Sequence, residues 1–255
     1  MKKLMLAAVA LMAAIALSGC IKVNSVTDIK ADGSGSAIIE FGVSQSVAEA
    51  IEEMQEIDPG NDDMEMPDFE DMDRGYLDKV GKMYGARVTS YEMSDKDGAI
   101  GVKIAFDFDN LRAMSAMMGA AVNEDPSDGL GIYDAGDGNY VLKRAYYEFP
   151  DFPVQEDDED EAADSAGESD AEMDPAQMGK QMELMGKLMG AMSELDVRMS
   201  ITVPGDIIAT NAPAQEGRTS VWTINSSNMM TAGMDMEPEI TFSGKGLKIK
   251  DVIAE

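Results

Sequence analysis

The stretch IGVKIAFDF, residues 100–108, decides the fold class of this chain. Every second side chain in it is large and apolar, and the side chains between them are small or charged. One set comprises Ile100, Val102, Ile104, Phe106 and Phe108, and the other comprises Gly101, Lys103, Ala105 and Asp107. A period of two residues is typical of a β-strand with one buried face. The sequence therefore predicts a sheet with one face in a core and one face in water.

The strand at 100–108 ends one of three hairpins that the turn chemistry predicts. Asp-Gly or Gly-rich turns separate apolar runs in DIKADGSGSAIIEF (28–41), SYEMSDKDGAIGVKIAF (90–106) and IYDAGDGNYVL (132–142). Asp and Gly adopt the left-handed backbone conformations that tight hairpin turns require. The sheet is therefore expected to be antiparallel.

Helical periodicity appears between these hairpins. Residues 45–57 and 110–122 carry apolar side chains at spacings of three and four, with Ser46 and Asn110 as expected N-caps. Residues 75–84 form a shorter candidate helix, and a Met-rich helix is expected at 175–194. Helices that alternate with hairpins favour an α+β fold, an antiparallel sheet of hairpins with helices packed on one face.

The C-terminal part of the chain supplies further strands after an acidic segment. Strands are predicted at 199–203 and 218–225, with a last strand-like piece at 239–253. Residues 155–174 contain eleven acidic residues and no basic or aromatic residue, so they are expected to be a disordered linker. Because each flanking set of strands is small, residues 20–255 are expected to form a single α+β domain around this linker.

The N-terminus reads as an export signal. Lys2 and Lys3 precede an apolar run from Leu4 to Leu17, and Leu17-Ser18-Gly19-Cys20 follows. This order matches a lipoprotein signal peptide over residues 1–19, with lipidation of Cys20. Cys20 is the chain's one cysteine, so no disulfide is available. The predicted location is the cell envelope, on a membrane through the lipid anchor. The outer membrane is favoured in a didermic host, because Ile21 instead of Asp follows Cys20.

Charge and composition exclude several classes of function. Without residues 1–19 the chain has 18 basic and 49 acidic residues, a formal charge of −31, so nucleic acid is not an expected partner. There is no histidine, which removes the commonest general base and the commonest metal ligand. No nucleophile or phosphate-loop motif is present, so the chain is not expected to be an enzyme, and it shows no cofactor or metal signature.

Two stretches of the sequence resemble a known family. The segment ITVPGDIIATNAPAQEGRTSVWTI (201–224) looks like the strand-turn-strand signature of the LppM-type bacterial lipoprotein domain, and VTDIKADGSGSAIIEFGVS (26–44) fits as its hairpin after the lipidated cysteine. The resemblance implies a membrane-tethered α+β domain of the cell envelope, with lipid handling suggested for some relatives and no catalytic residues to carry over.

The expected function is that of a non-catalytic envelope lipoprotein that binds a lipid or a protein partner. The alternative is a protein that binds Cu(I) through the Met-rich helix or divalent cations through the acidic loops, including residues 58–73. Met178, Met182, Met185, Met189 and Met192 share one stripe of that helix. We interpret the stripe as an apolar packing face, because a helix at this place needs one.

Overall fold

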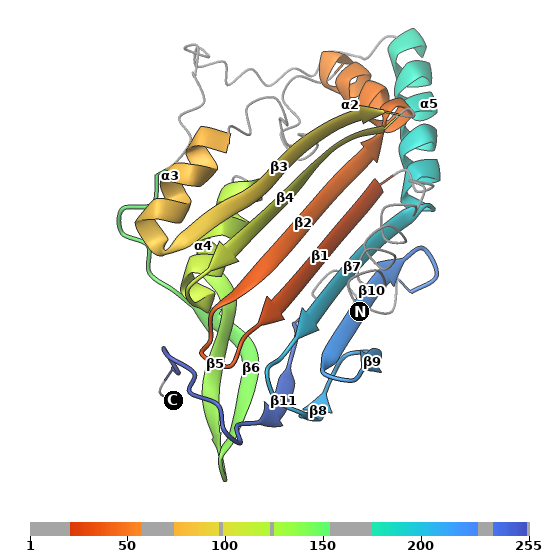
Figure 1. Cartoon of the computed structure of the whole chain (residues 1–255). Coiled ribbons are helices and arrows are strands. Elements are labelled where there is room, and N and C mark those ends of the chain that lie inside the picture. The colour runs from red at the N-terminus through yellow and green to blue at the C-terminus, as the bar shows by residue number, and fades with distance from the viewer. Residues whose placement is uncertain are drawn as a thin grey trace, which may run out of the picture.

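The computed structural model describes residues 21–57, 74–96, 99–122, 125–153, 175–228 and 237–253 (Figure 1). Helices and two open sheets make up the described part of the chain, so the predicted α+β class is confirmed. The segment expected to be a signal peptide (1–19), Cys20, the acidic residues 58–73 and the expected linker at 155–174 lie outside the described residues.

The larger sheet contains seven strands in the order β3-β4-β2-β1-β7-β10-β9. Their bounds are Ala86–Lys96 (β3), Ala99–Phe108 (β4), Gly35–Ser44 (β2), Ile21–Ile29 (β1), Leu195–Thr202 (β7), Thr219–Asn225 (β10) and Ala214–Glu216 (β9). The predicted hairpins 28–41 and 90–106 are confirmed as the β1–β2 and β3–β4 pairs. The sheet departs from the expectation at one place, since β1 and β7 run parallel.

The smaller sheet contains four antiparallel strands in the order β5-β6-β11-β8. Their bounds are Asp128–Gly136 (β5), Asn139–Tyr146 (β6), Ile240–Ser243 (β11) and Ile207–Thr210 (β8). The predicted hairpin at 132–142 is confirmed within β5 and β6. Each sheet thus combines strands from before residue 154 with strands from after residue 174.

Four helices complete the described residues: α2 (Gln45–Ile57), α3 (Arg74–Tyr84), α4 (Leu111–Val122) and α5 (Pro175–Met192). Helix α4 contacts α3, β3, β4 and β5, whereas α5 packs on α2 at one end of the large sheet (Figure 1). None of the helices in the described ranges is long and apolar enough to cross a membrane.

The N-caps follow the prediction in one case only. The Asn110 side-chain oxygen accepts a hydrogen bond from the Ala113 backbone N–H at 2.9 Å, which caps α4 as expected. Helix α2 already begins at Gln45, so the expected cap Ser46 lies inside the helix and Ser44 takes the flanking position. The prediction for Ser46 is wrong, because the strand β2 runs directly into the helix and moves its start by one residue.

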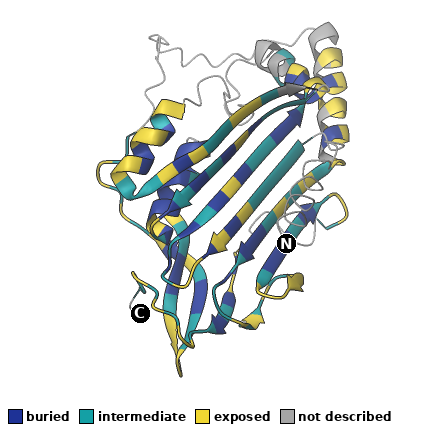
Figure 2. Cartoon of the chain, in the orientation of Figure 1, coloured by how far each residue is buried: buried dark blue, intermediate teal, exposed yellow. Residues whose placement is uncertain are grey.

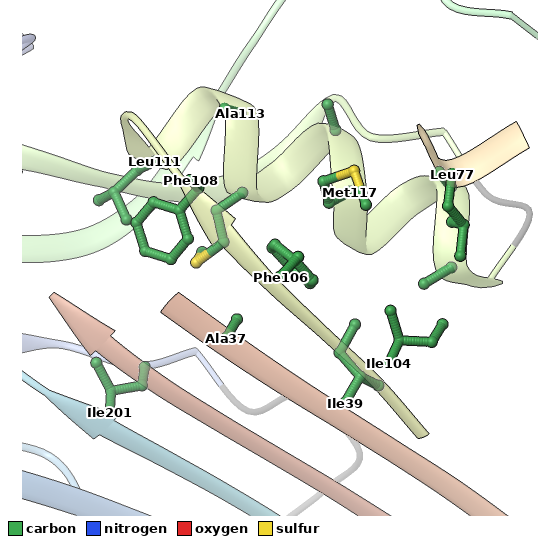
Figure 3. Packing of buried hydrophobic residues seen from close by; sticks show 14 of the residues in the cluster. Ala37, Ile39, Leu77, Ile104, Phe106, Phe108, Leu111, Ala113, Met117 and Ile201 are labelled. Carbon is green, nitrogen blue, oxygen red and sulfur yellow. The ribbon is translucent and has the colours of Figure 1, made fainter. Parts of the chain in front are cut away.

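The core lies between the inner face of the large sheet and α4 (Figure 3). Phe106 of β4 is 1% exposed, and it lies beside Ala37 of β2 on this face, with Met117 of α4 above them. The alternation predicted for 100–108 is confirmed from Val102 to Phe108, where every second residue is buried. Figure 2 shows the same alternation of buried and exposed residues along the strands.

Candidate ligand-binding cavity

A cavity of about 450 Å³ lies where the inner face of the large sheet, helix α4 and the start of the small sheet meet. Residues of strands β1 and β7, helix α4, strands β5 and β6 and residues 237–238 line it. Ligand pockets in proteins have volumes of roughly 300–1,000 Å³, so the cavity has room for one small apolar ligand or part of a longer one.

Short side chains in β1 leave this space open. Ser25 and Thr27 face inward, and the sheet register aligns Ser25 with Ile39 and Met199. The same register aligns Thr27 with Ala37 on one side and Ile201 on the other. Ser25 is therefore a small residue between two larger ones, Ile39 and Met199, whereas Thr27 lies between Ala37 and Ile201. A leucine or phenylalanine on β1 would fill the volume that Ser25 leaves.

Helix α4 closes the cavity with flexible apolar side chains. Met114 and Met118 line it, and the Thr27 hydroxyl lies 4.0 Å from the Met114 sulfur. Ser115 is 2% exposed, and its hydroxyl donates to the Leu111 backbone carbonyl at 3.1 Å, so it does not need a ligand to satisfy it. Methionine has a flexible side chain that adapts its shape to its surroundings.

Glycine at position 129 allows β5 to approach α4 this closely. A Cβ atom added there would lie 1.9 Å from the Ser115 side-chain oxygen and 2.7 Å from its Cβ. These distances are far inside van der Waals contact, so any larger residue would push the strand away from the helix. This contact therefore depends on glycine at position 129.

A charged group stands on one side of the cavity. The Arg144 guanidinium binds the Asp128 carboxylate through two nitrogens, one of them Nε at 2.9 Å, and donates from a third nitrogen to Glu237 at 2.9 Å. These side chains are more than half exposed, so the group forms a rim in contact with solvent. The hydrogen bonds from Arg144, and then its charge, lower the pKa of the Asp128 carboxyl. The two carboxylates in turn raise the pKa of Arg144.

The arrangement is that of an amphipathic site, with an apolar interior and an ionic rim. It fits a ligand with an apolar chain and a polar end group. Within the described ranges no cluster of three or more metal-binding side chains of the His, Cys, Asp and Glu types occurs.

The structure corrects the interpretation of the methionine stripe. Met182 and Met189 are 73% and 69% exposed and Met185 is 42% exposed, whereas Leu184 and Ala191 of the same helix are buried. The prediction of a methionine packing face is wrong for these three residues, because α2 covers the other side of α5. The side chains of Met178 and Met192 lie outside the described residues.

Sequence reasoning did not find the cavity residues. Ser25, Thr27, Asp128, Arg144 and Glu237 belong to no motif. One signal was present in β1, where the inward positions read Val23, Ser25, Thr27 and Ile29, so two polar residues interrupt an apolar face. Such an interruption indicates either a surface strand or space beside the core.

Comparisons with known proteins agree with the resemblance noted in the sequence. The profile of the LppM domain family matches residues 22–236, which is most of the chain. The NMR structure of the folded domain of Mycobacterium tuberculosis LppM is similar at 13% sequence identity and a TM-score of 0.42, over 88% of this chain and 90% of that chain. A search of curated proteins finds no match.

Proposed function

Because this chain belongs to the LppM domain family, we propose that it is a cell-envelope lipoprotein that binds a lipid without converting it chemically. The acylated Cys20 holds it on a membrane, and the cavity beside β1 takes the apolar part of the ligand. The single observation that carries the proposal is the combination of an apolar interior with the ionic rim of Arg144, Asp128 and Glu237.

The position of the cavity supports this function. Ser25 follows Ile21 by four residues in β1, about 13 Å along a strand, so the cavity lies one short strand away from the proposed anchor. A lipid leaving the bilayer would therefore meet the cavity close to the membrane. The paired state of Asp128 supports a binding role over a hydrolytic one, since its carboxylate is already held by Arg144.

The binding test uses a fluorescent fatty acid and two matched variants of β1. The full chain should bind the probe saturably, one per chain, and Ser25→Phe should weaken binding at least about tenfold by filling the cavity. Val26→Phe is the control, because Val26 is 37% exposed and belongs to the opposite face of the strand. Its affinity should stay within about twofold of wild type.

A second variant distinguishes a filled cavity from a folding defect caused by Ser25→Phe. Met118→Trp fills the same cavity from α4, and both variants should keep wild-type circular dichroism. Binding by both filled variants as tightly as by wild type would overturn the cavity as the site, and so would equal loss in Val26→Phe.

The anchor is tested separately by mass spectrometry of the N-terminal peptide and by fractionation of the envelope. An acylated Cys20 and a membrane-bound protein, in the outer membrane of a didermic host, are the expected results. A Cys20→Ala protein distributed like wild type would contradict the anchor.

A further inference from the structure

We propose that the exposed methionine face of α5 docks on the surface of the bilayer beside the lipid anchor. This methionine face comprises Met182, Met185 and Met189, with Gly179, Gly186 and Gly190 next to them. The inference rests on the proposed anchoring through Cys20 and adds to it a second contact, which would set the orientation of the whole domain on the membrane.

Helix α5 has two faces of different kinds, and within the described residues one of them packs against α2. Leu184 and Ala191 are 1% and 3% exposed on the side toward α2, and Lys180 of α5 forms an ion pair with Glu53 of α2 at 3.6 Å. This side of the helix therefore packs against α2, while a further ion pair, Glu183–Lys187 at 3.9 Å, lies within α5 itself. The three methionines of the methionine face, in contrast, are exposed.

The methionine face itself contains no charged residue, and the exposed ion pair of Glu183 and Lys187 borders it on the side of the glycines. A Cβ atom added at Gly179, Gly186 or Gly190 would meet nothing within 4 Å, so no other part of the described chain covers this side. The whole chain carries a formal charge of −29, and most of its surface is repelled by a membrane with anionic lipids. An uncharged helix face with long apolar side chains is the part that can approach such a surface.

The sheet register places the C-terminal end of α5 close to Ile21, the residue that follows the proposed anchor. Ile21, the residue that follows Cys20, pairs with Leu195, which comes three residues after the end of α5. On its other side Ile21 pairs with Val43, shortly before α2 begins. Figure 1 shows the start of β1 beside the lower end of α5 and the end of β2 that leads into α2. The acyl chains of Cys20 would therefore enter the membrane next to α5.

This placement favours a bilayer over other occupants. An anchored protein has the membrane within reach at all times, so even a weak second contact is populated by its high effective concentration. The 18-residue helix is about 27 Å long and could lie along the interface, where methionine side chains enter the boundary between headgroups and acyl chains. A second copy or a Cu(I) ion would need no proximity to Ile21.

The experiment places an environment-sensitive dye at Met189. The full lipidated chain carrying Met189→Cys is labelled with a thiol-reactive NBD dye and reconstituted in phosphatidylcholine vesicles with and without spin-labelled quencher lipids. Ile208→Cys is the matched control, since Ile208 is 57% exposed on β8 of the small sheet. We expect a blue shift and strong quenching at position 189 and neither effect at position 208.

The number of dyes per chain separates this proposal from the anchor. A lipidated Cys20 has no free thiol, so only the introduced cysteine can be labelled and one dye per chain is expected. Two dyes per chain would show that Cys20 is free, which contradicts the anchor. With one dye per chain, equal and aqueous spectra at both positions overturn the docking proposal. Shielding at 189 that depends on protein density or on added Cu(I) but not on quencher lipids also overturns it.

A second pair of variants tests the chemistry of the contact, with a dye at Gly190→Cys as the readout. Replacing Met182, Met185 and Met189 together by Leu should keep the quenching, and replacing them by Gln should abolish it. Both variants should fold, because the replaced side chains are exposed. Quenching that survives the Gln replacements would contradict an apolar contact.

Discussion

Single residues decide what the cavity can hold and how its rim is charged. Ser25 and Thr27 leave space because they are short, and Gly129 lets β5 lie against Ser115 of α4. Arg144 has the opposite role, since it gathers two carboxylates from β5 and from residue 237 into one ionic group. Replacing Ser25 or Arg144 should therefore change a property of the site and leave the fold in place, whereas a larger residue at Gly129 would separate β5 from α4.

The charge of the rim gives a prediction for Asp128. In Arg144→Met the pKa of Asp128 should rise toward the ordinary value of about 3.9, because the hydrogen bonds and the positive charge that lower it are gone. NMR titration of the carboxyl carbons measures this change. The pKa of Asp32, lowered mainly by hydrogen bonds from Ser34, should stay as it is in wild type.

The sign of the linked stability follows from the direction of that shift. A carboxyl whose pKa is lower in the folded state stabilises the fold above its unfolded-state pKa, and this contribution disappears as the pH falls through the folded-state pKa. Wild type and Arg144→Met should therefore differ most near neutral pH and converge in acid. An unchanged pKa of Asp128 in the variant would contradict the assigned cause.

Helix and strand boundaries depend on how one element joins the next. Helix α4 begins after Asn110 with a side-chain cap, whereas α2 continues directly from β2, and its first residue precedes the serine expected as its cap. The periodicity of a helix shows which residues belong to it, but the exact start depends on the preceding strand.

Asn110, which caps α4, and Ser46, which was expected to cap α2, give a matched pair of predictions for the free energy of unfolding. Asn110→Ala should destabilise the protein by about 1 kcal/mol, because the Ala113 N–H loses its partner at the first turn of α4. Ser46→Ala should change stability by less than about 0.5 kcal/mol, since Ser46 lies inside α2 and its one side-chain hydrogen bond, to Ser44, is exposed. Urea unfolding of the two variants measures both values, and equal losses would contradict the assignment of the caps.

The whole molecule is organised by pairings between distant parts of the chain. The parallel β1–β7 pair joins the two parts of the large sheet, and the β6–β11 pair does the same in the small sheet. Residues 21–153 and 175–253 thus share both sheets. The two ends of the large sheet also differ, because α2, α5 and the start of β1 lie together at one of them (Figure 1).

These pairings bear on the expected single domain of residues 20–255, which remains a prediction. Limited proteolysis should cleave first within residues 155–174, and the two fragments should stay associated on size-exclusion chromatography and unfold in one thermal transition. The physical reason is that neither fragment can complete either sheet alone. Fragments that separate and each unfold cooperatively would show two domains.

The sequence by itself determined the local elements and the family. The alternation from Val102 to Phe108, the turns of the hairpins and the spacing of apolar residues in α2 and α4 are patterns within ten to fifteen neighbouring residues. Such patterns report backbone periodicity and the presence of a buried face, which is why the strands, hairpins and helices and the α+β class could be predicted. The two quoted segments were also sufficient to identify the LppM domain.

Only the tertiary structure decided where these faces meet. The cavity brings together Ser25, Met114, Asp128 and Met199, which are far apart in sequence, and no local pattern encodes their distance. Periodicity also showed that the methionines of α5 share one stripe, but not that α2 would cover Leu184 and Ala191 instead. A helix with apolar residues on two sides can bury either one, and the choice depends on the neighbour against which it packs.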